Sequence, residues 1–263
     1  MTAQPLVFIT GASSGIGQAL ALRFYQAGYR LALVARRTSE VEKWVDANHI
    51  SASSYAIYSA DVADPSSIAA AGAACIAQQG LPDAVIANAG ISVGMDTGVR
   101  EDIDVMAQTF ATNNTGLAAT FHPFISGMEA RKTGRLVGIA SVAGIRGLPG
   151  HGAYCASKAA VIAYCESLRG EMRAATGKGG VKVVTIAPGY IDTPLTQGNP
   201  YAMPFLMPVN AFADSAFQAI TAGTSYRVIP WQMGVVAKLL RLLPNGLFDI
   251  ALSGRPRKKR RGE

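Results

Sequence analysis

Residues 6–17 read LVFITGASSGIG, in which an apolar run is followed at once by a turn that carries three glycines. The run predicts a buried strand, and the turn predicts the start of a helix. Such a helix start points unpaired N–H groups and the positive end of the helix dipole at one place, where phosphate binds well. Because glycine tolerates positive φ and a close backbone approach, Gly11, Gly15 and Gly17 indicate a pyrophosphate-binding loop. Three glycines after a strand also suit an ordinary tight turn, which is the alternative at this point.

A second motif lies farther along the chain, where residues 154–158 read YCASK. In a helix, Tyr154 and Lys158 are one turn apart and leave the same face. A cation within a few ångströms favours the phenolate, so we expect Lys158 to lower the pKa of Tyr154 from its ordinary value of about 10. Tyr154 is therefore a candidate proton donor and acceptor. An ordinary surface pair on a helix is the alternative.

Together these motifs resemble the single-domain branch of the short-chain dehydrogenase/reductase family, and the resemblance runs from the first strand to about Pro230. Other short segments of the family pattern follow in order: Asp61-Val62, Asn88-Ala89-Gly90, Asn113, Ser141, Pro188-Gly189 and Thr193. The resemblance implies an enzyme acting on CH–OH groups, which moves a hydride between a nicotinamide cofactor and a ketone or aldehyde. It also implies a homodimer or homotetramer.

Short apolar runs alternate with helical patterns along the chain, which is typical of repeated βα units. We therefore expect an α/β protein with a Rossmann-type, doubly wound parallel sheet of about seven strands and helices on both faces. The strands are expected at 6–9, 31–35, 56–59, 84–87, 136–140, 181–187 and 227–229. Ser39 with Glu42 predicts a capping box, and Asp64 before Pro65 predicts another helix start.

The resemblance implies four catalytic residues, namely Asn113, Ser141, Tyr154 and Lys158. Tyr154 would donate the proton, while Lys158 would lower the pKa of that phenol and bind the ribose beside the nicotinamide. Ser141 would hold the substrate oxygen. Asn113 would support a chain of water molecules that leads to the lysine. Asn114 is the nearest rival for this last role, because the match rests on the N-x-x-G spacing alone.

The residues expected to bind the cofactor lie in the glycine loop, at the ends of later strands and around the catalytic pair. They are Gly11, Ser13, Ser14, Gly15, Ile16, Gly17, Arg36, Arg37, Asp61, Val62, Asn88, Ala89, Gly90, Tyr154, Lys158, Pro188, Gly189, Ile191 and Thr193. By resemblance, Asp61 and Val62 would flank the adenine. Ile191 and Thr193 would lie near the nicotinamide carboxamide.

The end of the second strand bears on the choice between NAD and NADP. An acidic residue there would bind the ribose hydroxyls of NAD, whereas this chain has Arg36 and Arg37. Arginine is always charged and donates in a fork that suits a 2′-phosphate, so NADP(H) is favoured over NAD(H). The alternative is that both are solvated charges at a helix start. Ser13 and Ser14 stand where the family pattern can also place a basic residue, which weakens the preference.

The length of the chain favours one catalytic domain over residues 1–253, followed by a basic tail at 254–263. Prolines interrupt residues 190–210, which we expect to be an apolar substrate lid; an ordinary surface loop is the alternative. Residues 231–253 form an apolar C-terminal extension with helical spacing. Three roles suit this extension: packing within the molecule or an oligomer, peripheral contact with an anionic membrane, or a loose solvated end.

Hydrophobic residues make up 49% of the chain and charged residues 16%, which favours a sizeable core over disorder. The three cysteines cannot all pair and have no metal-ligand spacing, and no basic leader opens the chain, so we expect a cytoplasmic protein without a metal. Peripheral attachment to a membrane is the alternative location. Most of the net charge of +7 belongs to the tail, where nucleic-acid binding would be nonspecific, so no specific nucleic-acid partner is expected.

The expected substrate is an apolar carbonyl compound or its alcohol, such as a lipid, retinoid-like or steroid-like molecule, because the predicted lid is apolar. A sugar or polyketide-type intermediate is one alternative, and a non-catalytic dinucleotide-binding sensor is another. His151, three residues before Tyr154, is expected to be a solvated turn residue, and contact with the substrate is the alternative. Cys155 is expected to be a small buried thiol.

Overall fold

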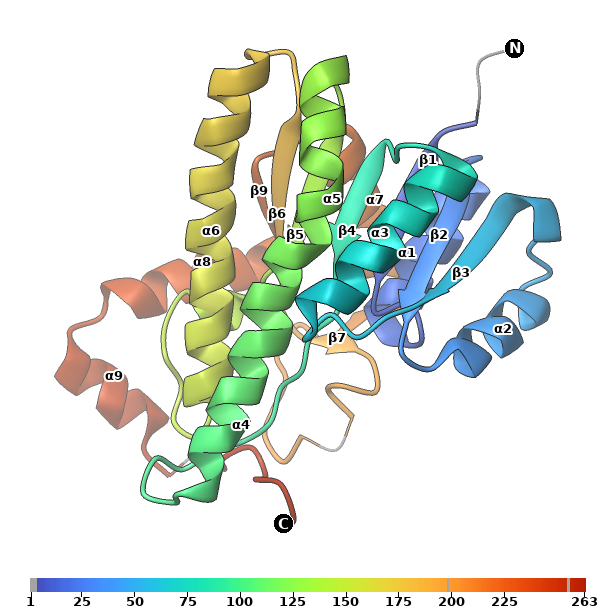
Figure 1. Ribbon diagram of the computed structural model, residues 1–263. Helices are drawn as coiled ribbons and strands as arrows, with labels where there is room; N and C mark the ends of the chain where they lie inside the picture. Colours follow the sequence, from blue (N-terminus) through green and yellow to red (C-terminus); the bar gives the residue numbers. More distant parts are fainter. Residues whose placement is uncertain (1–3, 198, 255) are drawn as a thin grey trace.

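The computed structural model describes residues 4–197, 199–254 and 256–263. In this part of the chain, seven parallel strands form the central sheet (Figure 1). Their order across the sheet is β3-β2-β1-β4-β5-β6-β9, which confirms the predicted Rossmann-type α/β fold. Gly198 of the predicted lid and Arg255 of the predicted tail lie outside the described residues, as do residues 1–3. The strands run over β1 Leu6–Thr10, β2 Arg30–Ala35, β3 Tyr55–Ser59, β4 Ala84–Ala87, β5 Arg135–Ile139, β6 Lys182–Pro188 and β9 Tyr226–Ile229, so each predicted boundary is within one residue of the observed one.

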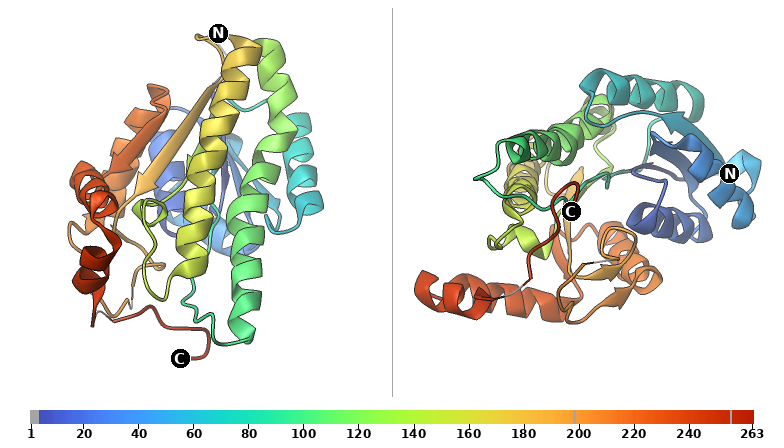
Figure 2. Two further views of the ribbon diagram at one scale, coloured as in Figure 1. Left: turned by 90° about the vertical axis from the view of Figure 1, so that its left-hand side faces the viewer. Right: turned by 90° about the horizontal axis from the view of Figure 1, so that it is seen from below.

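Helices cover both faces of the sheet (Figure 2). Two separate apolar clusters assign α1, α2 and α7 to one face and α3, α5 and α6 to the other. A π-helical turn at Ala111–Thr115 joins α4 to α5. The helices run over α1 Gly15–Gln26, α2 Thr38–Ala47, α3 Pro65–Gln79, α4 Glu101–Phe110, α5 Gly116–Arg131, α6 Gly152–Thr176, α7 Val209–Thr221, α8 Trp231–Leu242 and α9 Asn245–Leu252.

The residues of β1 show how the two faces of the sheet are built. The ring of Phe8 packs against that of Phe124 in α5, with 4.8 Å between centroids. Val7 and Ile9 belong to the opposite cluster, which contains Phe24 of α1. Because both faces are covered, a strand in this sheet has to be apolar along its whole length. This is why the strands are recognisable in the sequence as short continuous apolar runs.

The two predicted helix starts differ in outcome. Asp64 caps α3, because its Oδ1 accepts hydrogen bonds from the N–H groups of Ser66 at 2.9 Å and Ser67 at 3.3 Å. The capping box predicted at Ser39 is wrong. α2 already begins at Thr38, so Ser39 lies inside the first turn, and none of the described side chains caps this helix.

The segment between β6 and α7 is a loop, as its prolines predict. Its ends are held together by the short strands β7 Ile191–Asp192 and β8 Met207–Pro208, which pair in parallel. The N–H of Met207 also donates to the carbonyl oxygen of Tyr190 at 3.0 Å. The loop therefore has a closed base, and it hangs below the carboxyl ends of the main strands in Figure 1.

The last residues of the chain cross from α9 to the segment that precedes α4 (Figures 1 and 2). There the N–H of Gly94 donates to the carbonyl oxygen of Lys259 at 3.1 Å, and Gly94 pairs with Arg260 in a parallel β-bridge. These tail residues are therefore attached to the body of the protein, whereas the role of the 231–253 extension stays a prediction. Among the helices of the described ranges, none has the length and apolar character needed to cross a bilayer.

Candidate active site

The carboxyl ends of β1 to β6 surround a cavity of about 460 Å³. In an open parallel sheet, ligands bind in the crevice outside these strand ends. Every residue predicted to bind the cofactor lines this cavity except Gly17. Of the predicted catalytic residues, Ser141, Tyr154 and Lys158 line it, whereas Asn113 does not.

The glycine loop has the shape that a pyrophosphate requires. Gly11 and Gly15 have φ of +70° and +56°, which only glycine adopts readily. A Cβ on Gly17 would lie 2.2 Å from the carbonyl oxygen of Gly11, so a larger residue would displace the loop. Gly17 thus shapes the cavity from behind it. Among the described residues, no side chain caps the first turn of α1. The backbone N–H groups of this turn are therefore available to bind phosphate, and the loop fits a dinucleotide.

Two arginines border the same cavity beyond the end of β2. Arg36 Nη1 lies 3.4 Å from Asp61 Oδ2, and Arg37 Nη2 donates to Ser13 Oγ at 3.4 Å. Arg36 and Asp61 are both exposed, so their ion pair contributes little to stability. The guanidinium groups are therefore held loosely beside the glycine loop, where a phosphate could displace these weak contacts.

Lys158 is buried in α6, one helical turn after Tyr154. Its side chain is only 5% exposed, and its Nζ donates to the carbonyl oxygen of Ile139 at 2.7 Å. Its Nζ lies 5.8 Å from the ring centroid of Tyr154. Burial disfavours the charged ammonium and lowers the pKa of Lys158 from 10.5 to about 8. No carboxylate of the described residues pairs with it, so the group keeps much of its capacity to bind a ligand.

The hydroxyl of Tyr154 is in an equally dry environment. Burial raises its pKa to about 12, and a hydrogen bond with Ser141 offsets only part of this increase. The expectation that Lys158 lowers the pKa of Tyr154 is therefore wrong for the protein alone, because burial dominates the shift of this phenol. In this state Tyr154 keeps its proton throughout the neutral range, as a proton donor requires.

Ser141 follows β5 and is fixed by the turn that it begins. Its Oγ accepts a hydrogen bond from the N–H of Ala143 at 3.1 Å, at the start of the short 3₁₀ helix Val142–Gly144. The residue is 7% exposed and borders both the cofactor cavity and a second, neighbouring cavity. Its hydroxyl is thus positioned where the two cavities meet, close to Tyr154.

Asn113 and its rival Asn114 lie in the π-helical turn between α4 and α5. Asn113 Oδ1 accepts from the N–H of Ile91 at 2.8 Å, and its Nδ2 donates to Ser157 Oγ at 2.9 Å. Asn114 Nδ2 donates to the carbonyl oxygen of Ser157 at 2.9 Å, whereas Asn114 Oδ1 is buried and has no partner among the described residues. The side chain of Asn113 therefore ties α4–α5 to α6, and its role in a water chain stays a prediction.

The second cavity has a volume of about 810 Å³ and meets the first at Ser141 and Tyr154. The predicted lid and the C-terminal helices supply most of its wall. The main apolar contributors are Tyr190, Leu195, Tyr201, Met203, Met233, Val236, Leu240, Phe248 and Leu252. Tyr154 thus stands between a cavity that fits a dinucleotide and one that is largely apolar.

His151 belongs to this second cavity, although the sequence predicted a solvated residue. It is only 8% exposed, so that expectation is wrong. Its Nδ1 lies 3.2 Å from the carbonyl oxygen of Pro149, which can only accept, so Nδ1 carries the proton. Its Nε2 then accepts from the hydroxyl of Tyr201 in the loop after β7, at 3.1 Å. In the sequence, the spacing of three residues between His151 and Tyr154 was the feature that indicated a position near the candidate site.

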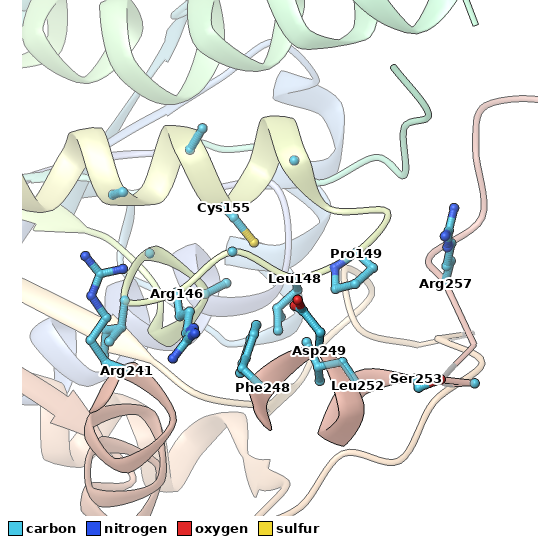
Figure 3. A pocket seen from close by; sticks show the side chains of 18 residues that line it. Arg146, Leu148, Pro149, Cys155, Arg241, Phe248, Asp249, Leu252, Ser253 and Arg257 are labelled. Carbon is cyan, nitrogen blue, oxygen red and sulfur yellow. The ribbon is translucent and has the colours of Figure 1, made fainter. Parts of the chain in front are cut away.

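Arg146 joins the C-terminal helices to the turn that follows Ser141. It donates to the carbonyl oxygens of Leu240 and Leu243 and, at 3.1 Å, to Asn245 Oδ1. Its guanidinium also lies 3.8 Å from the ring centroid of Phe248. Figure 3 shows Arg146 and Phe248 on the wall of a further pocket that lies against α9. These contacts fix the corner between α8 and α9 against the active-site turn.

Comparisons with known proteins agree with this geometry. A sequence model of the family described as short chain dehydrogenase matches residues 5–202. An uncharacterized oxidoreductase of Myxococcus xanthus is 36% identical over 243 residues, which cover 92% of this chain and 94% of the relative. The chain therefore belongs to the short-chain dehydrogenase/reductase family, and it is an oxidoreductase that acts on CH–OH groups, as the motifs predicted.

Solved structures share the fold at lower identity. A short chain dehydrogenase/reductase from Burkholderia phymatum in complex with NAD superposes with a TM-score of 0.80, at 23% identity and 95% coverage of each chain. ElxO with NADP bound gives a TM-score of 0.77, at 21% identity, with coverage of 86% of this chain and 97% of the other. Both kinds of nicotinamide dinucleotide thus occur on this fold.

Replacing Lys158 with methionine tests the cost of its burial. The folded pKa of about 8 lies below the ordinary 10.5, so the folded protein binds fewer protons than the unfolded chain between these values. Stability of the wild type should therefore rise relative to Lys158→Met as pH increases from 8 to 10.5, by a few kcal/mol at most. Urea unfolding at pH 7 and pH 9.5 measures this difference. An equal stability difference at both pH values would contradict the lowered pKa.

Proposed function

We propose that this chain is an NADP(H)-dependent oxidoreductase that interconverts an apolar ketone or aldehyde and its alcohol, with Tyr154 as the general acid and base. One observation carries the proposal. Tyr154 stands where the cavity suited to a dinucleotide meets the apolar cavity of about 810 Å³. A carbonyl group at this junction would meet the cofactor on one side and the phenol on the other.

The roles of the chain's own residues follow from their surroundings. A bound nicotinamide dinucleotide supplies or accepts the hydride at the substrate carbon. Tyr154 donates its proton to the carbonyl oxygen as negative charge develops there. Ser141, whose Oγ already accepts from Ala143, directs its own hydrogen at the same oxygen. The ammonium of Lys158 then stabilises the phenolate that remains.

The high pKa of Tyr154 favours the reductive direction for the first proton transfer. With a pKa of about 12, the phenol is fully protonated at neutral pH and ready to donate. Alcohol oxidation needs the phenolate instead, and forming it in this dry site requires the nearby positive charge of Lys158. We therefore expect reduction to proceed readily at pH 7 and oxidation to be favoured by alkaline pH.

Replacing Tyr154 with phenylalanine removes the proton donor and keeps the ring. We expect the decrease in NADPH absorbance with a panel of ketones and aldehydes to slow by at least about a hundredfold, as is typical for loss of a general acid. NADPH affinity, measured by fluorescence titration, should be retained. Tyr164→Phe in the same helix is the matched control and should keep full turnover. Retained turnover in Tyr154→Phe would overturn the assignment of the acid.

The preference for NADP(H) rests on Arg36 and Arg37. Both border the cofactor cavity, and Arg37 reaches Ser13 of the glycine loop. A 2′-phosphate beside the adenine end would replace these weak contacts with charge-assisted bonds to the guanidinium forks. NAD has no phosphate at this position, so it would form no such charge-assisted bonds with the two arginines.

The double change Arg36→Ala and Arg37→Ala should raise the KM for NADPH by tenfold or more, since a hydrogen bond to a charged group contributes about 1.5–3 kcal/mol. The KM for NADH should stay nearly unchanged. Lys43→Ala, which removes a nearby cation in α2, is the control. Equal effects on both cofactors would show that the two arginines do not select NADP(H).

The apolar lining of the second cavity supports a lipid-like, retinoid-like or steroid-like carbonyl compound. Tyr201, Met203 and Pro204 of the 190–210 segment form part of this lining, which supports a lid role for that segment. A sugar or polyketide-type intermediate remains the alternative and belongs in the same substrate panel. The non-catalytic sensor is no longer a candidate, because family membership makes the chain an enzyme.

The exposed face of α8 and α9 supports peripheral contact with an anionic membrane. Trp231, Leu239 and Leu242 are exposed by 67%, 60% and 80%, and Ile250 of α9 by 74%. Lys238 is exposed among the apolar residues of α8. Apolar side chains interleaved with cations favour the interface of an anionic bilayer. The homodimer or homotetramer and the cytoplasmic location stay predictions.

Sedimentation with liposomes tests the membrane contact. Leu239→Glu with Leu242→Glu should abolish binding to vesicles that contain 30% phosphatidylserine, because both changes place charges on the apolar face. A chain ending at Ser253 shows how much the basic tail adds. Equal partitioning of wild type and the double variant would remove the membrane proposal. If size-exclusion chromatography shows that the double variant loses an oligomer, the face is instead a subunit interface.

A further inference from the structure

The last residues of the chain form a strap across the body of the protein. We define this strap as residues 256–263. It lies against Gly94, where a Cβ would come within 2.2 Å of the carbonyl oxygen of Lys258. The bare backbone at Gly94 therefore allows the close approach, and its N–H bonds to the carbonyl oxygen of Lys259. The matched family region ends at residue 202, so the strap lies outside the segment that defines the family.

A buried carboxylate anchors the strap. Arg260 Nε donates to Asp102 Oδ2 at 2.7 Å, and its Nη2 lies 3.4 Å from Oδ1 of the same residue. The side chain of Asp102 is only 5% exposed and also accepts from the N–H of Asp96 at 2.7 Å. Its bonds to Arg260 lower the pKa of Asp102, so the carboxylate stays ionised at neutral pH. A two-pronged charged contact of this kind fixes both position and direction of the strap.

The strap brings Lys258 to the wall of the apolar cavity that also contains Tyr154. Lys258 is half-buried, and within the described residues no hydrogen bond or ion pair engages its ammonium group. Burial lowers the pKa of Lys258, and burial together with the nearby charge of Lys258 lowers the pKa of His151 on the same wall. The lysine thus lies on the same cavity wall as His151 and is only partly solvated.

The other basic side chains of this cavity are already engaged. The guanidinium of Arg146 donates hydrogen bonds to carbonyl oxygens at the α8–α9 corner and stacks over the ring of Phe248. Both ring nitrogens of His151 are engaged in hydrogen bonds, Nδ1 with the carbonyl oxygen of Pro149 and Nε2 with the hydroxyl of Tyr201. Among the described residues that line the cavity, Lys258 is therefore the cation whose donors are available to a ligand.

We propose that Lys258 binds an anionic group of the substrate, so that the enzyme acts on carbonyl compounds with an apolar body and one carboxylate or phosphate. The Asp102–Arg260 contact is the latch that holds Lys258 in place. This inference rests on the proposed function, because it takes the apolar cavity as the substrate site. A neutral apolar ligand would seal an unpaired ammonium into the cavity, which is costly, whereas an anion would neutralise it. The lysine therefore selects against neutral compounds as well as for anions.

A matched pair of substrates separates this proposal from general hydrophobic binding. The pair is a long-chain oxo fatty acid and its methyl ester, and a long-chain ketone bearing a phosphate monoester is a third compound. Lys258→Met keeps the length of the side chain and removes its charge. We expect it to lower kcat/KM for the acid and the phosphate by about tenfold or more, mainly through KM, and to leave the ester unchanged or improved.

Lys259→Met is the matched control, since the adjacent side chain is exposed and the backbone bond to Gly94 is retained. It should change no substrate by a comparable factor. A larger effect of Lys258→Met on the phosphate than on the acid would identify phosphate as the preferred anion, and the reverse would identify the carboxylate. An equal loss for acid and ester, or no loss for either anion, would overturn the proposal.

The latch is tested by Asp102→Asn and, should that variant fold poorly, by Arg260→Gln. Either change should reduce kcat/KM for the anionic compounds selectively and speed tryptic cleavage after Lys258 and Lys259. Circular dichroism checks that the body remains folded. Unchanged cleavage and unchanged selectivity in a folded variant would contradict a latch.

Failure of this proposal and failure of the proposed function give different results. Suppose that Tyr154→Phe abolishes NADPH oxidation while Lys258→Met changes kcat/KM for the acid and the ester equally. The redox function is then supported, and the anion site is refuted. If no carbonyl compound is turned over, the proposed function falls. Calorimetric titration of the same acid and ester into the NADP⁺-loaded protein then still decides whether Lys258 binds the anion.

Discussion

The buried ammonium of Lys158 is the constraint around which the active site is built. It is held by the carbonyl oxygen of Ile139 at the end of β5, and its helix α6 also carries Tyr154. Desolvating a cation is unfavourable, and here no carboxylate of the described chain compensates it. In the proposed mechanism, this positive charge stabilises the phenolate that Tyr154 forms in an equally desolvated position. Tyr154 and Lys158 have pKa values that move in opposite directions for the same reason, burial.

The sheet positions this pair, and the later part of the chain supplies much of the wall of the apolar cavity. Strand ends, the glycine loop and the arginines after β2 line the cavity that is proposed to hold the dinucleotide. The 190–210 segment, α8, α9 and the strap close the apolar cavity. Arg146 and Arg260 each connect distant parts of the chain, the first at the α8–α9 corner and the second at α4. The parts of this wall that come from α8, α9 and the strap follow the segment matched by the family.

Local signals made much of the fold and the cofactor site predictable. Strands buried on both faces are continuous apolar runs, and the glycines of residues 11–17 have conformations that side chains exclude. Contacts between distant residues were not predictable in the same way. The bond from His151 to Tyr201 and the pairing of Arg260 with Asp102 depend on tertiary packing, which leaves no periodic signal. The raised pKa of Tyr154 was missed because the sequence shows the neighbouring cation but not the depth of burial.

A crystal structure of the NADP⁺ complex tests the central claim most directly. The account predicts that the nicotinamide ring lies at the junction of the two cavities, with Tyr154 facing the space in front of it and Lys158 bonded to the adjoining ribose. The adenine end should then lie beside Arg36 and Arg37. A dinucleotide bound with its nicotinamide turned away from Tyr154, and with that phenol directed elsewhere, would contradict the proposed redox site.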